Sequence, residues 1–376
     1  MRVGFVLDES FDNPDGIQQY IQQLGMWLTA EGHEVYYLVG QTERQDIAGI
    51  YSLSRNVKVK FNGNWLSMPL PVPRAKLQQV LDELKLDVLH VQVPYSPFMA
   101  GRLIKLAPSS TAVVGTFHIL PYSWLATVGS MGLRLLNVRT ARRFDAMVAV
   151  SEPARRFARR GYGYHCEVVP NTFDYARFAP TKKSATPPGK TIVFLGRLVQ
   201  RKGVHHLLEA LNELKQSSRL PAGWRLIIGG KGELTDVLQS AVKRYGLQRI
   251  VRFEGFIAEA DKPAFLARAD IAVFPSTAGE SFGISLLEAM AAARGVVLAG
   301  DNPGYSSVMS GFTDQLFDPR RTSAFADLLE RWMSQSDERV ARAKEQRAYV
   351  QRFDEQIVGR EIAAVYEKAL QKRRAP

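Results

Sequence analysis

Short apolar segments alternate with amphipathic segments of helix length along the first 160 residues. The apolar segments are rich in β-branched and aromatic residues and predict strands at 2–7, 34–39, 87–93, 112–117 and 146–150. Residues 16–31, 74–85 and 153–160 lie between them and carry apolar residues at helical spacing. Nearly continuous apolar strands between helices are typical of a parallel sheet covered on both faces.

The pattern is interrupted at 181–190, TKKSATPPGK, a polar and proline-rich linker. It then resumes, with strands predicted at 191–196, 224–230, 250–255, 270–275 and 295–300. We therefore expect two α/β units of similar size, each with a ligand-binding edge at the carboxyl ends of its strands. A last helical pattern, at about 355–372, either returns to the first unit or extends beyond the second.

Composition supports a folded protein and limits its chemistry. The chain has 376 residues, of which 46% are hydrophobic and 23% charged, and this length suits about two domains. The single cysteine, Cys166, excludes an intrachain disulfide framework and a cysteine-type zinc site. Asp8 and Glu9 break the first apolar run, and no stretch reaches the ~20 apolar residues of a membrane span. We expect a cytoplasmic protein and leave binding to a membrane surface open.

The net charge of +12 favours phosphates, anionic lipid or nucleic acid as partners. Eight arginines lie between Arg134 and Arg160, and further cations lie near the C-terminus. No aromatic-interleaved RNA motif or zinc finger accompanies them, so nucleic acid is not expected as a partner. Residues 123–144 mix apolar side chains with arginines, which suits an interfacial helix on anionic lipid. The same mixture also suits a core helix with a solvated basic face.

Several familiar motifs are incomplete. The segment Gly230-Lys231-Gly232 has Thr235 where a dinucleotide fingerprint needs its third glycine. PPGKT at 187–191 precedes a predicted strand, whereas a P-loop follows one. No GxGxxG occurs elsewhere, which counts against a nicotinamide enzyme, and we predict no cofactor. No Asp-x-Asp occurs, so a metal-dependent nucleotide-sugar site of that type is not indicated, and we predict no metal.

The segment GRLVQRKG, 196–203, follows a predicted strand and is a candidate phosphate site. Gly196 permits a tight turn, after which Arg197 and Lys202 emerge at the sheet edge. Arginine can fork two phosphate oxygens and lysine adds a compact charge, so the pair suits a departing pyrophosphate. The alternative is solvated surface charge before a helix.

The segment STAGESFGISLLEAM, 276–290, carries two acids eight residues apart. We expect Ser281 to cap a helix whose free amides face an anion. Glu280 and Glu288 would then accept hydrogen bonds from neutral hydroxyls, with the diphosphate held by the cations of the preceding segment. The alternative is one surface acid and one ordinary helix acid.

Two first-unit features are weaker signals. Gly16 begins a predicted helix and permits close backbone approach to a phosphate, or is a simple capping turn. His118 ends a predicted strand at the sheet edge, where it binds a ligand or is a structural hydrogen bonder.

Together these motifs resemble the retaining GT-B glycosyltransferases of family 4. The resemblance rests on Gly196-Arg197, Arg201-Lys202-Gly203, the Gly279–Gly283 segment with Glu288, and Thr116-Phe117-His118. It covers nearly the whole chain, and Gly16-Ile17-Gln18 brings it nearest to the phosphatidylinositol mannosyltransferase branch. It implies two Rossmann-like domains with parallel sheets facing across a cleft. The first is 1–173, joined by 356–376, and binds the acceptor; the second is 174–355 and binds a nucleotide sugar.

The resemblance also implies roles for individual residues. Arg197 and Lys202 would bind the diphosphate, Glu280 and His118 sugar hydroxyls, and Glu288 the ribose. These first four form the expected catalytic set. Further donor-binding residues would be Gly16, Gly196, Lys231, Ile257, Ser281, Phe282 and Gly283. Acceptor-binding residues would be Gln18, Arg134 and Arg139.

The implied reaction is transfer of a hexose, mannose from GDP-mannose, to a lipid such as phosphatidylinositol at the inner face of the cell membrane. Alternatives are a UDP-sugar-dependent glucosyl- or galactosyltransferase and, less favoured, a nucleotide-sugar epimerase. Asp15-Gly16, Asn171-Thr172 and Ala293-Arg294 depart from the family pattern and leave sugar and acceptor open. The oligomeric state is also open.

Overall fold

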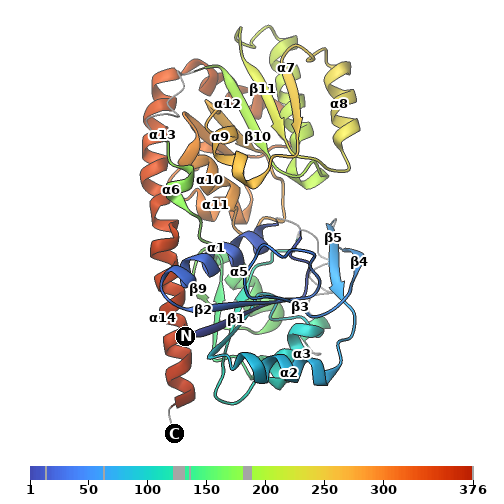
Figure 1. Cartoon of the computed structure of the whole chain (residues 1–376). Helices are drawn as coiled ribbons and strands as arrows, with labels where there is room; N and C mark the ends of the chain where they lie inside the picture. Colours follow the sequence, from blue (N-terminus) through green and yellow to red (C-terminus); the bar gives the residue numbers. More distant parts are fainter. Residues whose placement is uncertain (13–14, 62–63, 122–131, 135–136, 181–188, 375–376) are drawn as a thin grey trace. The chain divides into compact units, whose positions relative to one another are not determined.

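The computed structural model describes residues 1–12, 15–61, 64–121, 132–134, 137–180 and 189–374. The chain forms two compact units (Figure 1). One comprises Met1–Thr172 with Glu355–Pro376, and the other Phe173–Asp354. Each boundary differs from the predicted one by a single residue.

The first unit contains a seven-stranded parallel sheet in the order β3-β2-β1-β6-β7-β8-β9. Its strands are β1 (Arg2–Leu7), β2 (Glu34–Val39), β3 (Ile50–Ser52), β6 (Val88–Val91), β7 (Ala112–Phe117), β8 (Ala146–Ala149) and β9 (Glu167–Val168). An antiparallel hairpin is formed by β4 (Asn56–Phe61) and β5 (Asn64–Pro69). The helices are α1 (Gly16–Ala30), α2 (Arg74–Leu84), α3 (Met99–Leu106), α5 (Glu152–Phe157) and α14 (Glu355–Arg374).

The second unit contains a six-stranded parallel sheet in the order β12-β11-β10-β13-β14-β15. Its strands are β10 (Thr191–Leu195), β11 (Arg225–Gly229), β12 (Val251–Gly255), β13 (Ile271–Phe274), β14 (Val296–Gly300) and β15 (Leu316–Phe317). The α-helices are α6 (Tyr175–Phe178), α7 (Val204–Gln216), α8 (Thr235–Arg244), α9 (Lys262–Leu266), α10 (Ile284–Ala292), α11 (Pro303–Val308), α12 (Thr322–Ser334) and α13 (Ser336–Val350). Short 3-10 turns are η2 (Gln200–Lys202), η3 (Glu259–Asp261), η4 (Thr313–Gln315) and η5 (Gln351–Phe353).

The predicted fold class is confirmed: both units are Rossmann-like, and all ten predicted strands are present. The helix predicted at 153–160 differs, because α5 ends at Phe157 and continues as a π-helical turn, η1 (Ala158–Tyr162). The wider turn places Tyr162 in an aromatic cluster, 5.1 Å from the Tyr95 ring and 5.4 Å from that of Phe117. Local helical pattern alone does not report such a tertiary contact.

The C-terminal helix α14 packs on the first unit, where it contacts α1, β7 and β8. A 2.7 Å hydrogen bond joins the Tyr366 hydroxyl to Nδ1 of His90, and both side chains are fully buried. Arg373 adds an ion pair with Asp145 at 2.7 Å. Helix α14 therefore completes the fold of the first unit.

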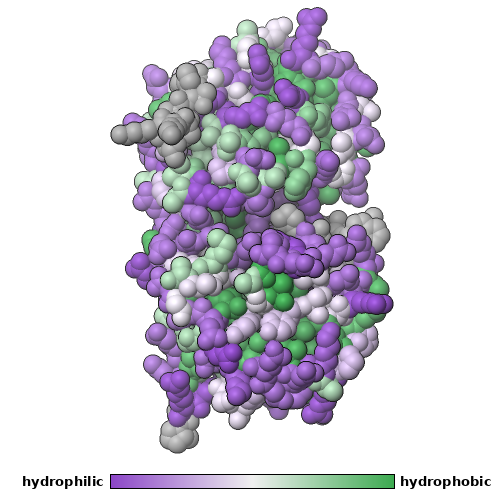
Figure 2. Space-filling view, in the orientation of Figure 1, coloured by the Kyte–Doolittle hydropathy of each residue, from purple (hydrophilic) through white to green (hydrophobic). Residues whose placement is uncertain are grey.

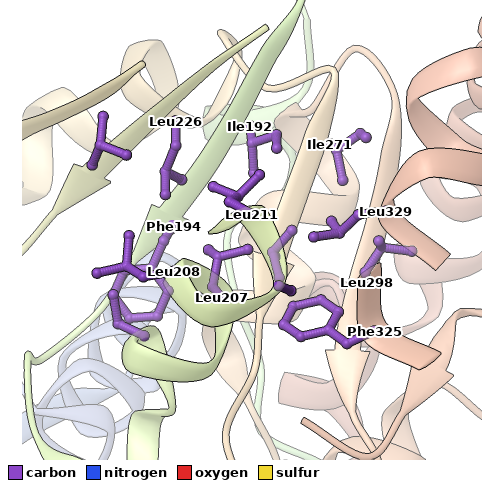
Figure 3. Close-up of a cluster of buried hydrophobic side chains, with 14 of the residues drawn as sticks. Ile192, Phe194, Leu207, Leu208, Leu211, Leu226, Ile271, Leu298, Phe325 and Leu329 are labelled. Atoms are coloured by element: carbon purple, nitrogen blue, oxygen red, sulfur yellow. The ribbon is translucent and has the colours of Figure 1, made fainter. Parts of the chain in front are cut away.

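A hydrophobic core in the second unit supports the loops discussed below. Figure 3 shows Leu207, Leu208 and Leu211 of α7 beside Ile192 and Phe194 of β10. Each such buried side chain contributes roughly 1.5–3 kcal/mol relative to exposure. This packing fixes the positions of the carboxyl ends of β10 and β13.

Hydrophilic side chains predominate on the face drawn in Figure 2, with apolar side chains in patches among them. Exposed apolar residues of this scattered kind are normal on folded domains. Among the described residues, no helix is both long and apolar enough to cross a membrane.

Candidate active site

The loops that follow β10 and β13 meet at the edge of the second sheet. These two strands are neighbours, and the strand order reverses between them. Open parallel sheets bind ligands at such a reversal, beyond the carboxyl ends of the strands. The backbone oxygen of Arg201 accepts hydrogen bonds from Ser276 Oγ at 3.0 Å and Thr277 N at 2.9 Å. The two loops therefore form one structure.

Gly203 allows this close approach. Its φ is +71°, and a Cβ placed there would lie 1.9 Å from the backbone oxygen of Pro275. Any other residue would have to displace backbone in addition to adopting a left-handed conformation. Gly203 thus fixes where η2 lies against the β13 loop.

Glu280 lies at the centre of this structure. Its Oε1 lies 2.6 Å from Nη1 of Arg201, 2.9 Å from Nζ of Lys202 and 2.8 Å from Oγ of Ser276. These contacts between Glu280 and the cations of the preceding segment were not predicted from the sequence. The joined loops bring the acid directly onto Lys202, whereas a linear reading keeps the two motifs apart.

The cluster has fixed ionisation states. Burial alone would raise the pKa of Glu280, but the charges of Lys202 and Arg201 outweigh it and hold this pKa at about 2. Burial lowers the pKa of Lys202, an effect that the Glu280 charge opposes and the charge of Arg197 reinforces. Two cations, Arg201 and Lys202, contact one carboxylate and leave an excess of one positive charge at this point, which suits an anionic ligand.

Helix α10 begins at Ile284, with Gly283 as its N-cap residue at φ +119°. The prediction that Ser281 caps this helix is therefore wrong, because Ser281 lies two residues before the cap. Phe282 is 4% exposed and its ring packs 5.6 Å from that of Phe353. The Phe282 side chain therefore has a structural role, and only its backbone can contact a ligand.

Glu288 lies on α10 and is 5% exposed. Nζ of Lys262 lies 3.5 Å from its Oε1 and 2.6 Å from Oε1 of Glu259. Burial raises the pKa of Glu288, and Lys262 opposes that rise. Both acids of the 276–290 segment are paired, Glu288 is buried and the Glu280 side chain is only 11% exposed, which excludes the alternative of ordinary surface acids.

Beside the point of strand reversal, an open groove of roughly 860 Å³ follows the ends of β11 and β12. Lys231, Gly255 and Phe256 line it, and Phe256 is 59% exposed. Ile257 packs next to this groove against Gly229. The two predicted residues Lys231 and Ile257 thus lie in neighbouring loops.

In the first unit, His118 follows β7 and is 6% exposed. Its Nε2 lies 2.8 Å from Oε1 of Gln92, and burial lowers its pKa to about 3. The ring is therefore neutral at physiological pH. Because Gln92 Oε1 only accepts, Nε2 carries the proton and Nδ1 is left as an acceptor.

Helix α1 carries the other two predicted residues of this region. Gln18 is 4% exposed; its Nε2 donates to the backbone oxygen of Ser10 at 2.9 Å, and its buried Oε1 has no partner among the described residues. A Cβ at Gly16 would meet nothing within 4 Å, so the start of the helix is open. On the same helix, the Tyr20 ring lies 5.2 Å from that of His118.

Comparison with known proteins identifies the family. Residues 14–177 match the family model described as Glycosyltransferase Family 4, and residues 178–349 match the model described as Glycosyl transferases group 1. A phosphatidyl-myo-inositol mannosyltransferase of Mycobacterium tuberculosis is 32% identical over 378 residues, which cover 98% of this chain and 97% of that protein. The chain belongs to glycosyltransferase family 4.

Other proteins similar to this glycosyltransferase have different activities or ligands. A glycogen synthase of Mycobacterium tuberculosis is 32% identical over 395 residues, covering 96% of this chain and 93% of that protein. The crystal structure of Anabaena HepE with UDP-glucose is similar in fold, with a TM-score of 0.76 at 20% identity, over 97% of this chain and 99% of that one. The family assignment makes the protein a hexosyltransferase of GT-B fold.

Arg134 and Arg139 of the glycosyltransferase are exposed. The guanidinium of Arg134 lies over Gly163, with Nη2 3.2 Å from where a Cβ of that glycine would be, so Arg134 lies beside η1. No contact among the described residues brings either arginine to Gln18. Much of the predicted interfacial segment 123–144, namely 123–131 and 135–136, lies outside the described residues.

Sequence reasoning missed three residues of the site: Arg201, Ser276 and Lys262. Arg201 stands inside the GRLVQRKG motif, so its charge was a visible signal. Ser276 opens the 276–290 segment but carries no chemistry of its own. Lys262 is 9% exposed, and nothing in the sequence marks it as buried beside Glu288. Among the described residues, no three His, Cys, Asp or Glu side chains are grouped as a metal site would require.

Proposed function

We propose that this glycosyltransferase transfers mannose from GDP-mannose, with retention, to a hydroxyl of a lipid such as phosphatidylinositol. The observation that carries the proposal is the pair of cations Arg201 and Lys202 on Glu280 beyond the carboxyl ends of β10 and β13, with the buried carboxylate of Glu288 on the helix that follows. An excess of positive charge suits a diphosphate, and ionised carboxylates suit hydroxyl donors. The mannosyltransferase relatives, at 32% identity over nearly the full chain, support mannose and a lipid.

In this proposal the donor lies along the second sheet. Arg197 and Lys202 hold the diphosphate and stabilise the charge that grows as it departs, which requires no reorganisation in a preformed site. Glu280 accepts from hydroxyls of the sugar, and Glu288 from the ribose. Gly196 permits close approach, and the groove at Lys231 and Ile257 holds the base. The amides near Ser281, Phe282 and Gly283 complete the phosphate contacts.

The first unit supplies the acceptor side. Neutral His118 offers Nδ1 to a sugar hydroxyl near the reacting carbon. Oε1 of Gln18, which has no partner among the described residues, accepts from a hydroxyl of the acceptor. Gly16 lets the first unit approach the diphosphate. We propose that the incoming hydroxyl attacks from the side on which the diphosphate leaves, so that a departing phosphate oxygen receives its proton. This order of events retains the configuration at the sugar.

An enzyme with a lipid acceptor must bind the membrane surface. We propose that this enzyme binds the inner leaflet of the cell membrane. Exposed Arg156, Arg159 and Arg160 on α5 and η1, with Arg134 beside them, favour anionic lipid phosphates. Flotation with vesicles of phosphatidylglycerol tests this, since each arginine near the surface contributes about 1 kcal/mol. Failure to float at low salt would contradict a membrane-bound enzyme.

The glycogen synthase relative and the UDP-glucose complex of HepE favour a second candidate, glucosyl transfer from a UDP-sugar. A panel of GDP- and UDP-sugars, each with and without phosphatidylinositol vesicles, separates the two. Mannolipid formed from GDP-mannose alone supports the first. Product formed from a UDP-sugar overturns it in favour of the second. A sugar epimer formed without acceptor would indicate epimerase activity.

A further inference from the structure

Oε1 of Glu280 makes all the hydrogen bonds and ion pairs that link this carboxylate to other described residues. Arg201 Nη1, Lys202 Nζ and Ser276 Oγ all meet Oε1. No hydrogen bond from the described residues reaches Oε2. The side chain is nevertheless only 11% exposed, so its direction is set by the protein and not by solvent.

The groups that meet Oε1 are themselves fixed. Ser276 is 1% exposed, and its backbone oxygen accepts a hydrogen bond from Nδ2 of Asn302 at 3.0 Å. The backbone oxygen of Arg201 accepts from Ser276 Oγ and Thr277 N, so Arg201 is held at both ends. A carboxylate bound by one oxygen to such a frame cannot exchange its two oxygens freely.

We propose that Ser276 and Arg201 are positioning residues that hold Oε1 of Glu280 and thereby direct Oε2 toward the sugar of the donor. This rests on the proposed function, in which Glu280 meets the sugar. Arg201 has a second effect through the same contact. Because Arg201 pairs with the same carboxylate, Glu280 does not fully compensate the positive charge of Lys202. Lys202 can therefore still attract the diphosphate.

A double-mutant cycle between Ser276→Ala and Glu280→Gln tests the inference. Ser276→Ala removes one hydroxyl without changing charge, and Ser306→Ala is its matched control, because Ser306 Oγ bonds Asp301 Oδ1 at 2.7 Å in the same unit. Binding of the nucleotide sugar and of its nucleoside diphosphate is measured by calorimetry, alongside kcat and KM. Losing a hydrogen bond to a charged group predicts about a 10- to 100-fold fall in kcat/KM.

The proposal predicts that Ser276→Ala weakens binding of the nucleotide sugar about tenfold, because the sugar contacts Oε2. The affinity for the nucleoside diphosphate, which lacks the sugar, should stay within threefold of wild type. In the Glu280→Gln background, Ser276→Ala should have little further effect. Additive losses, or equal weakening of both ligands, would overturn the positioning role.

Arg201→Gln tests the second residue, with Arg219→Gln as control, because Arg219 also pairs with two acids, Asp327 and Glu330, in the same unit. Arg201→Lys should recover activity to within a few-fold by restoring the charge. Arg201→Gln should also move the acid limb of the kcat/KM profile to higher pH, because Glu280 loses a cation. An unmoved limb, or no recovery by lysine, would overturn the role of Arg201.

Failure of the proposed function is distinguishable from failure of this inference. If the wild type turns over none of the sugars in the donor panel, the proposed function fails. The cycle between Arg201→Gln and Glu280→Gln is then measured by urea unfolding, which needs no substrate. A coupling indistinguishable from zero would overturn the contact, and a measurable coupling would support it.

Discussion

Replacing Lys202 by methionine removes one cation from the site while keeping the length of the side chain. Lys202 is 16% exposed at its side chain and lies 2.9 Å from Glu280. In a site of this burial, a charge about 4 Å from a phosphate oxygen interacts by roughly 4 kcal/mol. Comparable charge-stabilising groups supply about 2.7–4 kcal/mol to catalysis when removed singly. We expect kcat to fall about 100- to 1,000-fold.

The assay is initial-rate formation of glycosylated lipid from the donor that the wild type uses. Lys202→Arg retains the charge and serves as the control, and thermal unfolding verifies that both variants are folded. Because Arg197 and Arg201 remain, donor KM should change less than kcat. A folded Lys202→Met protein whose kcat lies within threefold of wild type would refute the role given to Lys202.

Three further predictions follow from buried contacts. Glu288→Gln should weaken nucleotide binding about tenfold, because an amide replaces a charged acceptor; unchanged binding by calorimetry would contradict the ribose contact. Gly203→Ala should abolish transfer and lower the melting temperature, since its Cβ would meet the Pro275 oxygen at 1.9 Å; a wild-type melting curve would argue against that loop geometry. Burial raises the folded-state pKa of Asp8 to about 6, above its unfolded value, so its contribution to stability is present below about pH 4 and is lost as the pH rises through 6. Relative to Asp8→Asn, the wild type should lose roughly 3 kcal/mol of unfolding free energy between pH 4 and 7, measured in urea, and parallel pH curves would contradict this.

The alternation of apolar strands and amphipathic helices was enough to predict both sheets, because buried parallel strands leave a continuous apolar signature. The candidate cations and acids were also visible, since Arg197, Lys202, Glu280 and Glu288 stand in recognisable segments. The contact between Lys202 and Glu280 was not predicted. It depends on two loops 70 or more residues apart meeting at neighbouring strands, which no local pattern reports.

The buried partner of Glu288 could not be predicted either, because a tertiary contact leaves no local pattern in the sequence. Lys262 looks like any surface lysine in the sequence, yet it is 9% exposed beside Glu288. The helix start was misplaced because Ser281 is a better capping residue than glycine by preference. The close packing of Gly283 against Tyr305, whose ring a Cβ would approach to 2.7 Å, instead requires glycine at that position.

The most direct test of the central claim is the product formed from radiolabelled GDP-mannose with phosphatidylinositol vesicles. The proposed function predicts a labelled mannosyl lipid whose sugar keeps the donor's anomeric configuration. It also predicts that Lys202→Met forms this product about 100- to 1,000-fold more slowly. A labelled lipid formed only from a UDP-sugar, or one with inverted configuration, would contradict it.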